Sequence, residues 1–318
     1  MQRRGFLQTS AKALGAAVFS GLAGVAEGGG PADLGFMERR PFGRTGHMRS
    51  TITFGAIVVM NEEQSLANRV VAEAIEAGVN GFDVAPSYGD AELKLGEALK
   101  GKRDRVFLQC KTGRWDKAGA AEELRASLQR LQTDWVDLYQ LHALSNLPDL
   151  DTIFGPGGAM EAFEEARQAG LIRFIGFSTH NPATALEALK RYDFASVMVP
   201  CNYVLHHYGR WGMDLIEEAS RREIGILALK PIGARPWQEG EPRPYPKCWY
   251  RPFSTNHDID LAMRYALSLP LTSAVPSGDV RLFRRCLQAA RHWRPLSDAD
   301  RAELERKAAE LTPIFTCA

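Results

Sequence analysis

The stretch GFDVAPSYGDAE at residues 81–92 shows how this chain is organised. It begins as a strand, in which Phe82 and Val84 are apolar and the small residues Gly81 and Ala85 flank them, and Pro86 ends that strand. The loop that follows holds Tyr88, and Asp90 at its end is a residue type that caps a helix. Asp83 therefore lies near the C-terminal end of a strand, which is where a (β/α)8 barrel places its chemistry.

Strand-like and helix-like segments alternate through the rest of the chain in eight pairs, and this pattern predicts a parallel sheet. The strands are apolar along most of their length, which is typical of strands buried on both faces. No pair of glycine-rich phosphate turns divides the chain into Rossmann halves, so a barrel is favoured over a long open sheet. The predicted fold class is α/β, a (β/α)8 TIM barrel with an N-terminal hairpin and an extra C-terminal helix over 298–311. We expect strands at 52–59, 81–85, 106–111, 136–142, 172–178, 196–202, 225–230 and 273–276, with helices at 65–77, 91–100, 118–131, 159–169, 182–191, 211–222, 258–269 and 280–290.

The composition excludes several classes of protein. The 318 residues carry a net charge of +1, which gives no electrostatic footprint for nucleic acid or an anionic membrane. Five cysteines are scattered without a Cys-x-x-Cys pair, which argues against an iron–sulfur or zinc-ribbon site. Cys201, His206 and His207 lack a fourth ligand at a plausible spacing, so we predict no metal site there.

The first 30 residues differ from the remainder. Arg3 and Arg4 form a twin-arginine pattern, an apolar run rich in Ala and Gly follows from 11 to 26, and a glycine run then breaks it. This order predicts a twin-arginine signal peptide over residues 1–30, export to the periplasm by the twin-arginine machinery, and a barrel domain over 37–318. An N-terminal arm without a targeting role is the alternative. The run is too short and too interrupted for a membrane span.

Four polar residues stand at or just after the ends of three consecutive expected strands: Asp83, Tyr88, Lys111 and His142. Taken singly, Asp83 and Tyr88 would also suit a capped turn with a ring packed on it. A lysine and a histidine at the ends of apolar strands, however, are costly to bury without partners. All four together therefore indicate one site at the C-terminal face of the barrel.

The chain resembles the aldo-keto reductases over residues 37–318. The motifs DVAPSYGDAE, VFLQCKT and DLYQLH hold, in that order, Asp83 with Tyr88, then Lys111, then His142, and these match the family's catalytic tetrad. The resemblance implies an NAD(P)-dependent oxidoreductase. Such an enzyme reduces an aldehyde or ketone to an alcohol, or performs the reverse, on a small-molecule substrate by hydride transfer.

The tetrad chemistry is physically reasonable. A tyrosine hydroxyl with a pKa near 10 is a poor acid–base group at neutral pH, and a nearby ammonium lowers that pKa. We expect Lys111 to have this effect on Tyr88, the general acid/base, and Asp83 to hold Lys111 by an ion pair. His142 is expected to donate a hydrogen bond to the substrate oxygen.

The resemblance also implies cofactor contacts at the ends of the later strands, although Thr179 stands where the family has Asn. The family's Glu-Asn pair near the adenine does not appear, and Arg285-Cys286 lies in that region instead. We expect NADP as the cofactor, with NAD as the alternative. The cofactor-binding residues implied by the matched segments are Ser178, Thr179, Asn202, Lys230, Pro231, Gly233, Ser277, Gly278 and Arg281.

The longest irregular stretch, at 233–256, is rich in Pro and aromatic residues, and it follows the seventh strand on the catalytic face. Loops of that length are usually lids or binding loops. A second reading of the whole chain is a cofactor-binding barrel that serves as a regulatory or accessory module with little turnover. The tetrad favours the enzyme, since a binding module has no need of a lysine beside Tyr88.

Overall fold

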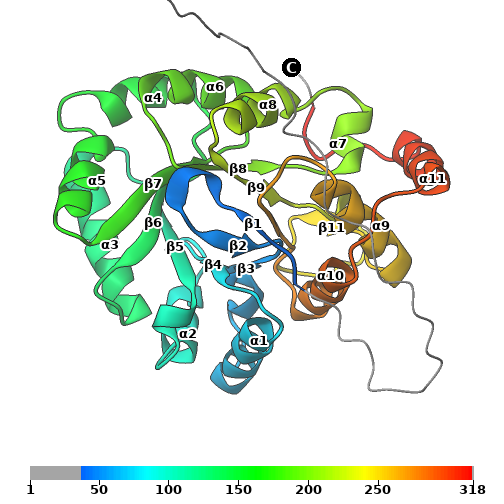
Figure 1. Cartoon of the computed structure of the whole chain (residues 1–318), viewed down its shortest axis with the longest axis horizontal. Helices are drawn as coiled ribbons and strands as arrows, with labels where there is room; N and C mark the ends of the chain where they lie inside the picture. The colour runs from blue at the N-terminus through cyan, green and yellow to red at the C-terminus, as the bar shows by residue number, and fades with distance from the viewer. Residues whose placement is uncertain (1–36, 317–318) are drawn as a thin grey trace, which may run out of the picture. The chain divides into compact units, whose positions relative to one another are not determined.

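The structure is a computed structural model that describes residues 37–316. The predicted signal peptide lies outside the described residues. Eight parallel strands form the barrel, in the order β12-β9-β8-β7-β6-β5-β4-β3 (Figure 1). Their bounds are β3 (Thr53–Gly55), β4 (Gly81–Asp83), β5 (Phe107–Thr112), β6 (Val136–Leu141), β7 (Ile172–Ser178), β8 (Ser196–Pro200), β9 (Gly225–Leu229) and β12 (Ser273–Val275).

The barrel closes between its first and last strands. A parallel bridge joins Ile52 to Ala274, and the Ala274 N–H donates to the Thr51 carbonyl at 2.8 Å. Because β3 and β12 are joined in this way, the sheet has no long open edge. The predicted (β/α)8 barrel is confirmed.

Helices surround the strands as an outer ring (Figure 1). Each strand is followed by the helix that the alternation predicts, and Pro182 begins one of them, as proline favours a first helical turn. The ring helices are α1 (Gln64–Glu76), α2 (Ala91–Ala98), α3 (Lys117–Leu131), α5 (Ala159–Gln168), α6 (Pro182–Arg191), α8 (Met213–Arg221), α9 (Asn256–Leu267) and α10 (Val280–Arg291). The extra helix α11 (Asp298–Ala309) is also present, with a capping box at Ser297.

The predicted N-terminal hairpin covers the floor of the barrel. It consists of β1 (Arg39–Pro41) and β2 (Met48–Ser50), joined through a turn in which Gly43 has a φ of +51°. A Cβ added at Gly43 would lie 2.4 Å from the backbone nitrogen of Gly225, so only glycine allows this close approach. Beneath the site, the barrel interior contains an apolar cluster that includes Phe42, Phe107, Leu138, Met198 and Leu227.

Several local expectations were wrong. The apolar run at 52–59 forms a strand only over Thr53–Gly55, and a 3-10 helix, η2, follows over Ala56–Val59. Asp90 does not cap α2 through its side chain, because its carboxylate accepts the backbone N–H of Asn61 at 2.7 Å instead. Both differences arise from contacts between segments, which local residue preferences do not encode.

Three of the connections hold elements that were not expected. The stretch at 233–256 is partly ordered into an antiparallel hairpin of β10 (Gly233–Pro236) and β11 (Tyr250–Pro252). Two short helices, α4 (Leu147–Phe154) and α7 (Tyr203–His207), lie in connections for which no element was predicted. Each of these pieces lies in a connection that follows a barrel strand, and the β10–β11 segment supplies part of the site described below.

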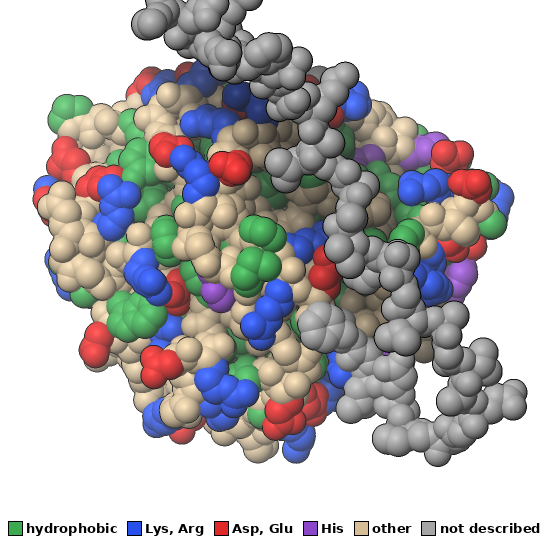
Figure 2. Space-filling model, viewed as in Figure 1, with side chains coloured by type: hydrophobic (Ala, Val, Ile, Leu, Met, Phe, Trp, Pro, Cys, Tyr) green, Lys and Arg blue, Asp and Glu red, His purple; other side chains and the backbone are tan. Residues whose placement is uncertain are grey.

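The described surface is mixed in charge. On the face drawn in Figure 2, basic and acidic side chains are interspersed, in agreement with the net charge of +1. Among residues 37–316, no helix combines the length and the apolar character needed to cross a membrane.

Candidate active site

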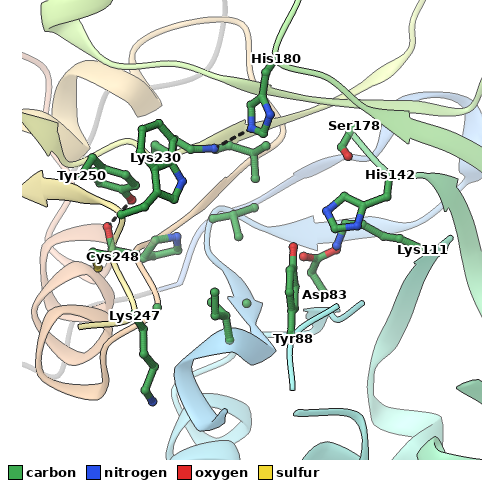
Figure 3. A pocket seen from close by; sticks show the side chains of 18 residues that line it. Asp83, Tyr88, Lys111, His142, Ser178, His180, Lys230, Lys247, Cys248 and Tyr250 are labelled. Atoms are coloured by element: carbon green, nitrogen blue, oxygen red, sulfur yellow. Dashed lines mark hydrogen bonds and ion pairs between the residues drawn. The ribbon is translucent and has the colours of Figure 1, made fainter. Parts of the chain in front are cut away.

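A cavity of about 240 Å³ opens at the C-terminal ends of the barrel strands (Figure 3). Its walls come from the ends of the barrel strands, from the loops that follow them, and from the segment that connects β10 to β11. All four residues of the predicted tetrad line it: Asp83, Tyr88, Lys111 and His142. The structure therefore brings together residues that lie up to 59 positions apart in the sequence, although their catalytic roles stay a prediction.

The Asp83–Lys111 ion pair forms the base of this cavity. Lys111 Nζ lies 2.5 Å from Asp83 Oδ1 and also donates to the Val84 carbonyl at 3.2 Å. The two side chains are 1% and 2% exposed, so water does not screen the pair. Burial, the largest single effect, lowers the pKa of Lys111, but the charge and hydrogen bond of Asp83 together with Tyr88 outweigh it, and the pKa lies above its ordinary value. Lys111 is thus an ammonium at neutral pH.

Tyr88 lies directly over this ammonium. Lys111 Nζ is 5.1 Å from the centre of the Tyr88 ring, and Figure 3 shows the phenol rising toward His142. Burial raises the pKa of Tyr88 and Lys111 opposes that effect only in part, so the pKa is raised and not lowered as the sequence analysis expected. The difference arises because the ring is desolvated and because Asp83 also disfavours the phenolate. Tyr88 therefore carries its proton at neutral pH.

His142 faces Tyr88 across the cavity. The two ring centres are 5.8 Å apart with planes at 86°, and His142 Nδ1 lies 3.5 Å from Ser87 Oγ. Burial lowers the pKa of His142 to about 3, with a further contribution from Lys111. A neutral imidazole keeps one N–H, and that N–H can donate a hydrogen bond to an oxygen placed between His142 and Tyr88.

Four of the predicted cofactor residues also line the cavity: Ser178, Lys230, Ser277 and Gly278. The Ser178 hydroxyl oxygen accepts the Ala143 N–H at 2.8 Å, which fixes it beside the catalytic end. The Ser277 hydroxyl lies 2.6 Å from Tyr250 Oη, which ties it to the β10–β11 segment.

Lys230 gives the cavity an unbalanced positive charge. Its Nζ lies 2.9 Å from His180 Nε2 and over the rings of Trp249 and Phe315, and no carboxylate within residues 37–316 pairs with it. Burial lowers the pKa of Lys230 to about 7. A desolvated ammonium without a counter-ion suits an anionic group, and the phosphates of a dinucleotide would supply one. These residues therefore fit a nicotinamide dinucleotide.

The other predicted cofactor residues do not line the cavity: Thr179, Asn202, Pro231, Gly233 and Arg281. The Thr179 hydroxyl donates to the Leu144 carbonyl at 2.7 Å, and the Asn202 side chain caps α7 through the Leu205 N–H at 3.0 Å. The Arg281 guanidinium pairs with Asp279 at 2.9 Å. Their roles as cofactor contacts stay predictions.

Several lining residues were not singled out from the sequence. His180 stands two positions after Ser178, and that spacing, which places both on one side of an extended strand end, was the signal available. Trp249 and Tyr250 belong to the aromatic stretch that was expected to form a lid or binding loop. Lys247 anchors this stretch by donating to the Val58 carbonyl and to Glu62, each at 2.7 Å.

A metal site has no support in the described part of the chain. No group of three or more His, Cys, Asp or Glu side chains within 37–316 is placed to hold an ion. Cys201 Sγ and His206 Nε2 lie 4.0 Å apart, and His206 Nδ1 is 2.9 Å from the Tyr265 hydroxyl.

A (β/α)8 barrel with these four residues at its strand ends defines a class of oxidoreductase, and the comparison with known proteins agrees. The profile of the Aldo/keto reductase family matches residues 51–293, so the chain belongs to that family.

Its relatives include the oxidoreductase YqkF of Bacillus subtilis, 31% identical over 62% of this chain and 65% of that protein. Methylglyoxal reductase YeaE of Escherichia coli is 32% identical over 54% of this chain and 61% of its own length. Each match thus spans slightly less than two thirds of the relative. The holo form of the aldo-keto reductase AKR11C1 from Bacillus halodurans superposes with a TM-score of 0.66 at 26% identity, over 85% of this chain and 96% of the other.

Proposed function

We propose that this protein is an NAD(P)-dependent oxidoreductase that reduces an aldehyde or ketone to an alcohol, or performs the reverse, with Tyr88 as the general acid/base. One observation carries the proposal: a buried Lys111–Asp83 pair lies beneath Tyr88, in one cavity with the neutral His142. Membership of a family of oxidoreductases supports it.

The chain's own residues handle the proton and the developing charge. Carbonyl reduction places negative charge on oxygen, and the Tyr88 hydroxyl gives its proton to that atom. The Lys111 ammonium then stabilises the phenolate that Tyr88 becomes, and Asp83 keeps the ammonium in place. His142 donates its N–H to the same substrate oxygen and orients the carbonyl. In the reverse direction, the phenolate accepts the proton of the alcohol.

A nicotinamide dinucleotide supplies the hydride when it is bound, and we propose NADP, with NAD as the alternative. Ser178 would hold the nicotinamide end, and Lys230 would hold the phosphates. Ser277 and Gly278, at the start of α10, would bind further along the same nucleotide. The β10–β11 segment crosses this part of the cavity, which favours slow release.

The test is nicotinamide absorbance and fluorescence of the purified protein, followed during addition of aldehydes, ketones and dicarbonyls. Methylglyoxal belongs in the panel because one relative is a methylglyoxal reductase. Substrate-dependent oxidation of the bound dinucleotide by the natural protein, lost in Tyr88→Phe, supports the enzyme. Binding without turnover supports the accessory module, and failure to bind either dinucleotide rejects both readings.

We also propose that the protein is exported to the periplasm by the twin-arginine machinery, which carries folded proteins. Arg3 and Arg4 support this. Free nicotinamide cofactors are not expected there, so the protein would leave with its cofactor bound and recycle it by oxidising a second substrate. Cell fractionation of the natural chain and of the Arg3→Lys/Arg4→Lys variant tests export. Mass spectrometry of the nucleotide in the periplasmic fraction tests whether the protein is exported with its cofactor bound. Rapid exchange of the cofactor on dilution would reject this proposal.

A further inference from the structure

Gln109 contacts the ion pair from below. It stands two residues before Lys111 on β5, so both side chains point to the inside of the barrel. Its Nε2 donates to Asp83 Oδ1 at 2.7 Å, and that is the oxygen that Lys111 Nζ contacts at 2.5 Å. Gln109 is 0% exposed, so water does not compete for the carboxylate.

The strand register makes this contact specific. Asp83 and Gln109 are side-by-side partners in the parallel ladder of β4 and β5, and the Val84 N–H donates to the Gln109 carbonyl at 3.0 Å. The amide also lies 3.5 Å from Met198 Sδ, which packs on it from β8. The Nε2 end of the amide is thus held by Asp83 and Met198, whereas its buried Oε1 has no hydrogen-bond partner among the described residues.

A carboxylate can rotate about its own bond, and one ammonium does not by itself determine which way its plane faces. Gln109 Nε2 is a second donor to the same oxygen, and it further restricts that rotation. Hydrogen bonds to an ionised acceptor are also stronger than those between neutral groups. Gln109 therefore favours the one orientation of Asp83 in which Oδ1 faces Lys111 Nζ.

We propose that Gln109 is a positioning residue for carbonyl reduction, which orients Asp83 so that the Lys111 ammonium stays beneath Tyr88. This inference rests on the proposed function. Gln109 contacts neither the phenol nor the cavity, so it acts through the ion pair alone.

The experiment compares two isosteric substitutions inside the barrel, Gln109→Met and Gln140→Met. Gln140 is the ladder partner of Lys111, is also 0% exposed, and neither polar atom of its side chain has a hydrogen-bond partner. We expect Gln109→Met to lower kcat about tenfold, the effect of one lost charge-assisted hydrogen bond, with KM and dinucleotide affinity within about twofold of the natural protein. Gln140→Met should leave all three quantities unchanged.

Equal kcat values in the two variants would overturn the positioning role. A parallel rise in KM and dinucleotide Kd would overturn it too, because that result signals general loosening of the barrel. Should Gln109→Met not fold, Gln109→Asn keeps the amide but is one methylene too short to reach Asp83, and the same loss of kcat is expected.

A measurement without turnover separates this inference from the proposed function. In a crystal structure of Gln109→Met, we expect the Asp83 carboxylate to be rotated and its Oδ1 to have left Lys111 Nζ. An unchanged Asp83–Lys111 contact overturns the inference even if no carbonyl compound is ever reduced. Turnover by the natural protein that Tyr88→Phe abolishes, with no difference between Gln109→Met and Gln140→Met, rejects the inference and leaves the reductase in place.

Discussion

One end of the cavity is built from strand ends and the residues just after them, whereas the other is built largely from loops that the C-terminal tail contacts. The first end, which we call the catalytic corner, consists of Asp83, Tyr88, Lys111 and His142. Its ion pair joins two neighbouring strands, and their register sets Asp83 beside Gln109. Because the ladder holds these positions, the geometry of the corner depends on backbone pairing more than on side-chain packing.

The second end of the cavity is held by contacts between aromatic rings and not by strand pairing. We call it the aromatic wall, a cluster of ring contacts in which His180 and Trp249 line the cavity and Phe315 and Trp211 pack with them. Phe315, from the C-terminal tail, stacks on His180 at 5.3 Å and on Trp211 at 5.1 Å, and it meets Trp249 edge-on at 5.7 Å. Ring contacts between loops can shift in ways that a strand ladder cannot. The comparison therefore predicts that changes in the catalytic corner mainly affect kcat, whereas changes in the aromatic wall mainly affect KM and ligand affinity.

The largest effect should come from the corner. Replacing Tyr88 by Phe removes the proton donor and leaves the ring, so we expect kcat to fall about 10²–10⁴-fold, the usual contribution of acid–base catalysis. Steady-state kinetics with the best carbonyl of the panel measures it, and dinucleotide affinity should be unchanged. Retention of full activity would show that another group supplies the proton.

Removing Lys111 should damage the fold itself. Lys111→Met leaves the Asp83 carboxylate buried without its charge partner, and we expect the free energy of unfolding to fall by about 3–5 kcal/mol. Adding Asp83→Leu removes the stranded charge and should recover most of that loss. Urea denaturation of the single and double variants measures both. A double variant no more stable than Lys111→Met would mean that the stranded charge is not the cause.

The two ends of the cavity also differ in how well the sequence predicts them. The tetrad positions follow from local signals, because each residue lies at or just after a strand end within a motif that resembles the family's. Helix α6 was predicted with the bounds that it has, Pro182–Arg191, since proline and the apolar spacing define it. These signals need no knowledge of distant segments.

The aromatic wall has no such local signal. Lys247 anchors the β10–β11 segment to Glu62, 185 positions away, and Phe315 reaches back to His180 from the end of the chain. Neither contact leaves a periodic pattern. The raised pKa of Tyr88 was missed for a related reason, since burial depends on the complete fold.

Lys230 lies against the aromatic wall, and its removal should weaken nucleotide binding more than catalysis. We expect Lys230→Met to raise the dinucleotide Kd about tenfold, because a charge-assisted contact to phosphate is lost. Lys190→Met, whose side chain is 73% exposed and pairs with Glu187, is the matched control and should bind normally. Titration followed by tryptophan fluorescence measures both, and equal affinities would place the phosphates elsewhere.

The same lysine gives a dependence on pH. Burial lowers the pKa of Lys230 to about 7, so the ammonium that an anion requires is lost as the pH rises through that value. Dinucleotide affinity of the natural protein should therefore fall between about pH 6 and pH 8, and that of Lys230→Met should stay flat over the same range. Parallel curves would show that another group is responsible.

The smallest effect should come from the aromatic wall. Phe315→Ala removes ring contacts to three other members of the wall, two of which line the cavity, and leaves the catalytic corner in place. Each ring pair contributes about 0.5–1.5 kcal/mol, and neighbouring rings can repack, so we expect KM to rise about threefold with kcat nearly unchanged. Phe315→Leu keeps apolar bulk, so its KM should lie between that of the natural protein and that of Phe315→Ala. A loss of kcat as large as that of Tyr88→Phe would mean that the C-terminal tail also stabilises the catalytic corner. The two ends of the cavity would then not be independent.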